Sequence, residues 1–197
     1  MRGREIKLEK LSIKEKGYLF GLYKGDGYIY HNIKDRHYTV EFFLNSKRDR
    51  DIIKFVHFLL KKLKLNTFLI KDKRFNCIKI KANSKYLYHF LNQDFHLFLN
   101  DKNFALGFIS GFLDAEGSVI KSSFRITNTD LEIMNLISDI LTSEGIGNRL
   151  SLRKRSAKDT KPIYSMYISV KFKSLNHISI KAERLHSGVE IFKKYCP

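Results

Sequence analysis

A short pattern of small residues followed by an acid occurs twice in this chain. The first copy spans residues 19–27 and the second residues 109–117, so they lie about 90 residues apart, nearly half of the chain's length. A repeat at that separation predicts a protein built from two related halves. Aligned, the copies pair Gly21 with Gly111, Gly25 with Ala115, Asp26 with Glu116 and Gly27 with Gly117.

The spacing of the small residues predicts two closely packed helices. Residues four apart share one face of a helix, so Gly21 and Gly25 form a smooth face in the first copy, and Gly111 and Ala115 form one in the second. Such a face lets another backbone approach closely. That packing would offset the roughly 0.5–1 kcal/mol by which a glycine inside a helix is less stable than alanine.

The acid of each copy falls on the last turn of its expected helix. Gly27 and Gly117 fit helix stop positions, where a left-handed residue is wanted. Asp26 and Glu116 would then lie at the negative ends of the helix dipoles. If the helices pack side by side, two acids and two helix C-termini converge, and such a point favours a divalent cation with oxygen ligands.

The two copies resemble the LAGLIDADG motif of the homing endonucleases. The match is close at the glycine and acid positions. Asp114 keeps the first aspartate of the family pattern, Lys24 replaces it in the first copy, and Glu116 replaces the second aspartate. Two motifs in a chain of 197 residues resemble the single-chain, pseudo-twofold members of the family.

The resemblance implies an α/β (α+β) fold of two pseudo-symmetric αββαββα halves. The motif helices would form their interface, and saddle-shaped antiparallel sheets would lie on DNA. The expected parts are an N-terminal arm over residues 1–12, a first half over 13–99 and a second half over 100–197.

The resemblance also implies an activity, which is site-specific cleavage of double-stranded DNA across the minor groove, leaving short 3′ overhangs. Asp26 and Glu116 would bind Mg²⁺, for which Mn²⁺ can substitute, with help from the carbonyls of Gly27 and Gly117. The family often has a lysine after the second strand of each half. Lys47 is the candidate in the first half and the second half has none there, so we expect the two strands to be cut at unequal rates.

Composition agrees with a polyanionic partner. The formal net charge is +17 and the pI about 9.8, which favours nucleic acid, although a solvated basic surface or an anionic membrane would also account for it. No apolar run reaches the roughly 18 residues of a spanning helix, and no secretory signal is seen. Cys77 and Cys196 make neither a disulfide framework nor a zinc site. We expect a monomer in a reducing intracellular compartment, cytoplasmic or organellar.

Alternating polar and apolar residues after each motif predict two hairpins in each half. Helices are expected over residues 51–65, 84–99 and about 129–145, and near the C-terminus. Inward-facing strand residues are expected to be Val40, Phe42, Leu44, Ile78, Ile80, Ala82, Phe124, Ile126, Leu150, Leu152, Tyr164, Met166, Ile168 and Val170.

The polar faces of the hairpins suit the major groove, which is about 12 Å wide and admits a two-stranded ribbon. Arginine and lysine can pair with guanine and asparagine with adenine, while other side chains touch phosphate alone. The candidate DNA-binding residues are Tyr28, Tyr30, Asn32, Lys34, Arg36, Thr39, Glu41, Lys71, Arg74, Asn76, Lys79, Lys81, Lys121, Ser123, Arg125, Thr127, Arg149, Ser151, Arg153, Arg155, Lys158, Ser165 and Tyr167.

Two other functions remain open at this point. The chain could be an RNA maturase that assists splicing of its own intron, or a DNA-binding regulator that does not cleave. Retention of both acids argues against a purely binding role, because a pair of like charges is unfavourable without a metal.

Overall fold

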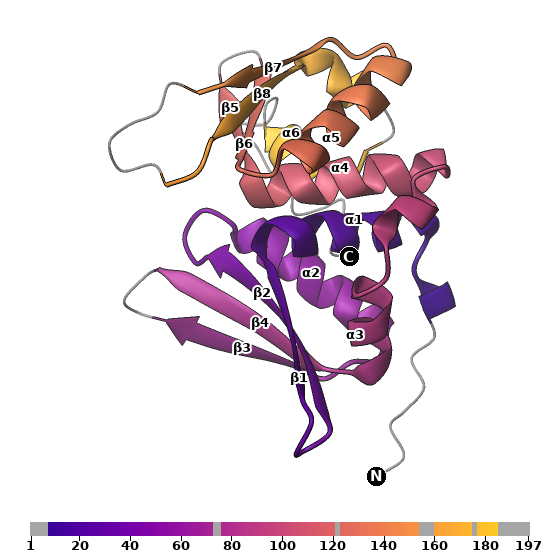
Figure 1. Cartoon of the computed structure of the whole chain (residues 1–197). Coiled ribbons are helices and arrows are strands. Elements are labelled where there is room, and N and C mark those ends of the chain that lie inside the picture. The colour runs from indigo at the N-terminus through magenta and orange to yellow at the C-terminus, as the bar shows by residue number, and fades with distance from the viewer. Residues whose placement is uncertain (1–7, 73–75, 121–122, 154–159, 175–176, 185–197) are drawn as a thin grey trace.

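The computed structural model describes residues 8–72, 76–120, 123–153, 160–174 and 177–184. The chain forms two halves of similar order, joined along a pair of helices (Figure 1). The first half consists of the 3-10 turn η1 (Leu8–Lys10), α1 (Ile13–Asp26), β1 (Gly27–Asn32), β2 (His37–Asn45), α2 (Arg50–Lys62), β3 (Thr67–Asp72), β4 (Cys77–Asn83), α3 (Lys85–Leu91) and η2 (Phe95–Phe98). The second consists of α4 (Lys102–Glu116), β5 (Gly117–Ile120), β6 (Ser123–Asn128), α5 (Leu131–Ser143), β7 (Asn148–Leu152), β8 (Tyr164–Ser169), η3 (Val170–Ser174) and α6 (Ile180–Arg184).

The sheets of the two halves have the same topology. Each is antiparallel and four-stranded, in the order β1-β2-β4-β3 and β5-β6-β8-β7. The register corresponds as well: Gly27 pairs with Phe42, and Gly117 pairs with Ile126. This confirms the predicted α+β fold of two αββαββα-like halves.

One face of each sheet packs against helices and forms the core. Val40, Phe42, Leu44, Ile80 and Ala82 of the first sheet are at most 1% exposed. In the second sheet Phe124, Ile126, Met166 and Ile168 are fully buried. The apolar stripe of α2 covers the first sheet as its helical spacing predicts; its buried members are Ile52, Phe55, Val56, Leu59 and Leu60, followed by Leu63 after the helix.

Side-chain contacts set the ends of several elements, and two expectations differ in the structure. β1 ends at Asn32, because the Asn32 side-chain oxygen accepts hydrogen bonds from the backbone of Lys34 and Asp35 and starts a turn. The predicted helix over 84–99 ends at Leu91, and Asp94 caps a separate 3-10 turn. Leu152 is 64% exposed, not inward-facing, because it ends an edge strand.

Two further observations concern the chain as a whole. Within the expected N-terminal arm, Leu11 is 2% exposed and belongs to the core, while residues 1–7 lie outside the described part. Among the helices that the structure describes, none is both long and apolar enough to cross a bilayer.

Candidate active site at the helix pair

The helices α1 and α4 pack along their glycine faces, as the motif spacing predicts. They run in the same direction, since Gly17 lies opposite Phe104, Gly21 opposite Phe108 and Gly25 opposite Ala115. A Cβ on Gly17 or Gly21 would collide with backbone carbonyls of the other helix. The two main chains therefore touch each other, which no larger residue would allow.

The glycine face is one turn longer than the motif. Gly107 and Gly111 of α4 would carry their Cβ atoms into the carbonyl oxygens of Lys14 and Tyr18. Gly17 and Gly107 were not among the predicted interface residues. Extending the four-residue spacing backward by one step in each copy would have found them.

The two motif glycines at the helix ends have a different role from the one predicted. Gly27 has φ −103° and ψ 157°, and Gly117 has φ −89° and ψ 161°, so both are extended and the expected left-handed conformation is wrong. Glycine is needed for space, because a Cβ at Gly27 would run into Tyr23 and one at Gly117 into Leu113. Each helix thus passes directly into a strand, with its acid at the junction.

Asp26 and Glu116 lie at this junction, close to each other across the helix pair. A Cβ on Gly25, the residue before Asp26, would stand 3.1 Å from Cγ of Glu116. Burial raises the pKa of Asp26 to about 6, with Lys181 opposing the rise and Asp49 adding to it. Burial also raises the pKa of Glu116 to about 7, and repulsion from Asp26 contributes to that rise. The two carboxylates thus converge in a partly desolvated place, where negative charge is in excess.

Three side chains near these acids were not predicted. The Lys181 ammonium donates to the carbonyl oxygens of Ala115 at 3.1 Å and Gly117 at 2.9 Å, and its charge lowers the pKa of both acids. The side chain of Asn128 hydrogen-bonds to Glu116. Asp49 is 8% exposed and its charge raises the pKa of Asp26.

Lys47, the lysine predicted for this site, lies exposed in the turn after β2. Its backbone N–H donates to the Asn45 side chain at 3.0 Å, which forms that turn. Lys181, and not Lys47, is the lysine whose charge lowers the pKa of Asp26 and Glu116.

The acids suit a divalent cation, because a cation between them would relieve the repulsion that raises their pKa values. Among the described residues no group of three or more His, Cys, Asp or Glu side chains could hold a metal ion. An ion here would depend on Asp26, Glu116 and oxygens of the main chain or of water. Of the two carbonyl oxygens predicted as ligands, that of Gly117 already accepts a hydrogen bond from the Lys181 ammonium.

The face of each sheet that carries the predicted DNA-binding residues is polar and largely accessible. Corresponding rows cross the two sheets, Tyr28–Glu41–Lys81–Phe68 in the first and Ser118–Arg125–Tyr167–Arg149 in the second. The exposed or partly exposed candidates are Tyr28, Tyr30, Asn32, Lys34, Arg36, Lys71, Asn76, Lys79, Lys81, Ser123, Arg125, Thr127, Arg149, Ser151, Arg153 and Tyr167. Of these, Lys71 is exposed but lies in the row of Ile78 and the buried Leu44, on the opposite face of the sheet. Arg74, Lys121, Arg155 and Lys158 lie outside the described residues.

Three of these candidates are not exposed as predicted. Thr39, Glu41 and Ser165 are 6%, 9% and 6% exposed. All three lie on the inner strands β2 and β8, which have a neighbouring strand on each side. Glu41 pairs with Lys79 at 3.4 Å, and Thr39 donates to Asn83 at 3.1 Å.

Arg125 is the candidate with the clearest unmet hydrogen-bonding capacity. Its Nε is buried and, within the part of the chain that the structure describes, has no hydrogen-bond partner. A buried donor without an acceptor needs an explanation, and an acceptor on a bound polyanion would provide one.

Comparisons with known proteins agree with this architecture. Residues 103–186 match the family model of the LAGLIDADG-like domain. A curated relative, an uncharacterized protein of Methanocaldococcus jannaschii, is 29% identical over 150 residues, which are 74% of this chain. The chain spans 54% of that relative's length.

Solved structures extend the likeness to both halves. The homing endonuclease I-DmoI in complex with DNA and Mn superposes with a TM-score of 0.67 at 22% identity, over 90% of this chain and 99% of that one. The full-length WhiA protein of Thermotoga maritima gives a TM-score of 0.60 at 21% identity, over 88% of this chain and 59% of that one. Residues 103–186 thus match the LAGLIDADG-like domain, and the chain has, over both halves, the fold of I-DmoI.

Proposed function

We propose that this protein is a metal-dependent endonuclease that cuts both strands of a specific, extended DNA site. The observation that carries the proposal is the convergence of Asp26 and Glu116 where α1 and α4 end. A merely structural helix pair has no use for two partly buried acids that repel each other. A phosphodiester site with a divalent cation does, because carboxylate oxygens are the ligands that Mg²⁺ takes.

The sheets supply the second part of the proposal. Their polar faces carry lysine, arginine and tyrosine side chains on the chain's surface, and the sequence has a formal net charge of +17. Positive charge of this size attracts DNA largely independently of sequence, through its phosphates. Arg125, Arg149 and Tyr167 lie in one row across the second sheet, where they can reach bases or backbone in a groove. I-DmoI has the same fold and is seen with its target DNA.

In the proposed mechanism the protein holds the two acids in place. The reaction needs no covalent intermediate between the protein and the DNA. Asp26, Glu116 and the Gly27 carbonyl would hold Mg²⁺ or Mn²⁺. When bound, the ion lowers the pKa of water and neutralises the phosphate and the leaving oxygen. Asn128 and Lys181 fix Glu116 and the end of α4. One acid would serve each strand across the minor groove, leaving short 3′ overhangs, and one chain would suffice because it contains both motifs.

Substitution of the acids tests this function. Asp26→Asn and Glu116→Gln keep the shape of each side chain and remove its charge. We expect each to reduce cleavage of a selected target by at least about 100-fold, with DNA affinity retained in a gel-shift assay. Targets would come from selection of cleaved sites in a random library. Asp139→Asn, on the exposed face of α5, is the matched control and should cleave like the wild type.

Binding without cleavage would contradict the endonuclease. If wild-type protein with Mg²⁺ or Mn²⁺ binds DNA specifically and never cuts it, the chain is a DNA-binding regulator on this scaffold. If it instead promotes splicing of an intron RNA, and the two acid variants keep that activity, it is an RNA maturase.

A further inference from the structure

Both ends of Lys181 are bound to the last turn of α4. Its backbone N–H donates to Oδ1 of Asp114 at 2.8 Å. Its ammonium donates to the carbonyl oxygens of Ala115 at 3.1 Å and Gly117 at 2.9 Å. These residues flank Glu116, so a fixed positive charge lies at the negative end of the α4 dipole, where a cation is favoured.

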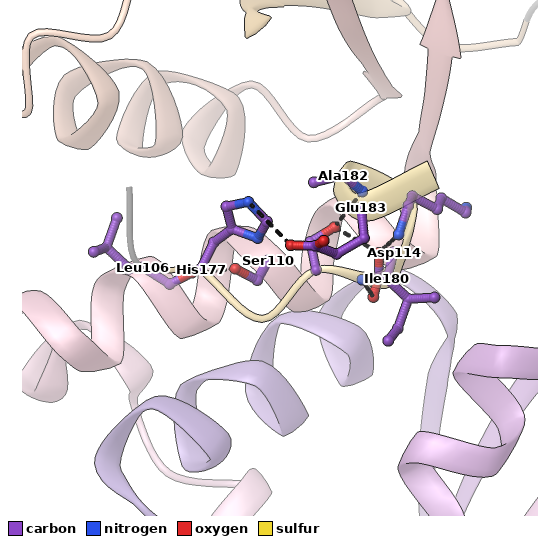
Figure 2. Close-up of polar contacts among 9 residues, drawn as sticks. Leu106, Ser110, Asp114, His177, Ile180, Ala182 and Glu183 are labelled. Carbon is purple, nitrogen blue, oxygen red and sulfur yellow. Dashed lines mark hydrogen bonds and ion pairs between the residues drawn. The ribbon is translucent and has the colours of Figure 1, made fainter. Parts of the chain in front are cut away.

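A buried carboxylate holds this lysine in place. Asp114 is fully buried and accepts hydrogen bonds from Tyr18 Oη at 2.8 Å, Ser179 Oγ at 2.7 Å, and the backbone N–H groups of Ile180 and Lys181 at 2.8 Å. Figure 2 shows Asp114 against the start of α6, next to Ile180 and Ala182. Since Tyr18 belongs to α1 and Lys181 immediately follows Ile180, one acid ties both motif helices to α6.

Among the residues that the structure describes, the first motif has no such arrangement. Lys24 aligns with Asp114, is exposed, and has its ammonium 4.8 Å from the ring centroid of Phe95. Two charges act on its neighbour Asp26: Lys181 lowers the pKa of that acid and Asp49 raises it. Asp49 thus adds a negative charge beside Asp26, while the Lys181 ammonium is bound at the end of α4 and acts on both acids.

We propose that Lys181 is a positioning residue that occupies the Gly117 carbonyl and acts as a built-in cation at the second motif. This inference rests on the proposed endonuclease function. An ammonium and a divalent ion on the same carbonyl oxygen would repel each other, so a bound metal would be held mainly by Asp26, Glu116 and the Gly27 carbonyl. Lys181 keeps Glu116 oriented and supplies part of the charge that a second, fully bound ion would otherwise supply.

Removal of the charge separates this role from a purely structural one. Lys181→Met should bind Mn²⁺ about fivefold more tightly in the DNA-free protein, because a nearby positive charge is lost. Titration calorimetry with Mn²⁺ alone measures this. The same variant should nick one strand of the selected target about tenfold more slowly than the other, because Glu116 is less well positioned. Lys181→Arg keeps the charge and should restore both values towards those of the wild type.

Two further variants keep the test decisive. Lys181→Gln retains a donor for the carbonyls but not the charge, so it should also tighten Mn²⁺ binding, and it replaces the methionine variant if that variant does not fold. Lys24→Met removes the same charge from the last turn of α1, away from these contacts, and should change neither value. Mn²⁺ affinity that is unchanged or weaker in folded Lys181→Met or Lys181→Gln would overturn the inference.

The outcomes also separate this inference from the proposed function. A wild-type protein that never cuts DNA contradicts the endonuclease, while tighter Mn²⁺ binding by the lysine variants still supports the role of Lys181. A wild-type protein that cuts DNA, with lysine variants that match it in Mn²⁺ affinity and strand preference, supports the endonuclease and overturns the role of Lys181.

Discussion

The two ends of the helix pair share a backbone and differ in their charges. In both motifs a helix passes directly into a strand at a glycine, and the strand that follows pairs in the same register. Lys181 lowers the pKa of both acids, but Asp49 adds a negative charge beside Asp26, whereas Asn128 hydrogen-bonds to Glu116 and the buried Asp114 belongs to the last turn of the second helix alone. A repeat therefore conserves packing, which both halves need, while the side chains around each acid have diverged.

The largest expected effect tests the part that the two halves share. Gly21→Ala and Gly111→Ala should each lower the free energy of unfolding by about 4 kcal/mol, because the added methyl group meets backbone that cannot move aside cheaply. Chemical denaturation measures both. Gly147→Ala is the control, since its Cβ would come no nearer than 3.9 Å to Ser169 Cβ. A cost below about 1 kcal/mol for either helix glycine would show that the helices do not pack this closely.

The next effect tests a position at which the halves differ. Asp114→Asn should destabilise the protein by about 3 kcal/mol, because the amide places a donor among the groups that donate to Asp114. The aligned Lys24→Met should change stability by less than about 0.5 kcal/mol, as an exposed substitution. Thermal unfolding at one pH compares the two. Equal losses of stability in the two variants would show that Asp114 stabilises its motif no more than Lys24 does.

The sheets provide a third comparison, through Arg125 and its counterpart Glu41. Both lie in the strand opposite the motif glycine, one residue before its partner. Arg125→Ala should weaken DNA binding by ~1–3 kcal/mol if the side chain reads a base, and lower the salt slope by about one if it also touches phosphate. Glu41→Ala should leave affinity unchanged or slightly higher, since it releases Lys79. Fluorescence anisotropy at several salt concentrations measures both, and unchanged binding by Arg125→Ala would place Arg125 outside the interface.

The smallest effect concerns pH. The folded-state pKa values of Asp26 and Glu116, about 6 and about 7, lie above their ordinary values of 3.8 and 4.5. The folded protein therefore binds more protons than the unfolded chain in this range, and its stability falls as pH rises. Without metal at pH 8, Asp26→Asn or Glu116→Gln should raise Tm by about 2–4 °C. The gain should shrink as pH falls through 7 and 6, and vanish below about 4. Asp139→Asn should show no such gain in Tm. A lower Tm for both acid variants at pH 8 would contradict repulsion between Asp26 and Glu116.

Much of the fold was predictable, because the signals that specify it are local. The four-residue spacing of Gly21 and Gly25 predicts a face for close packing, and the stripe of α2 predicts burial of Phe55 and Val56. Errors arose where neighbours in space decided the outcome. Glu41 has a charged side chain at an outward position, yet it is 9% exposed and pairs with Lys79 of the neighbouring strand β4.

The sequence by itself determined that two similar halves meet along glycine-lined helices and that one acid ends each helix, because periodicity and helix geometry act over a few residues. Only the tertiary structure decided which charges surround those acids. Lys181 lies 66 residues from Ala115 in the chain, and no spacing rule connects them. Electrostatic interaction depends on distance in space and on burial, so the character of the site emerged only when the chain had folded.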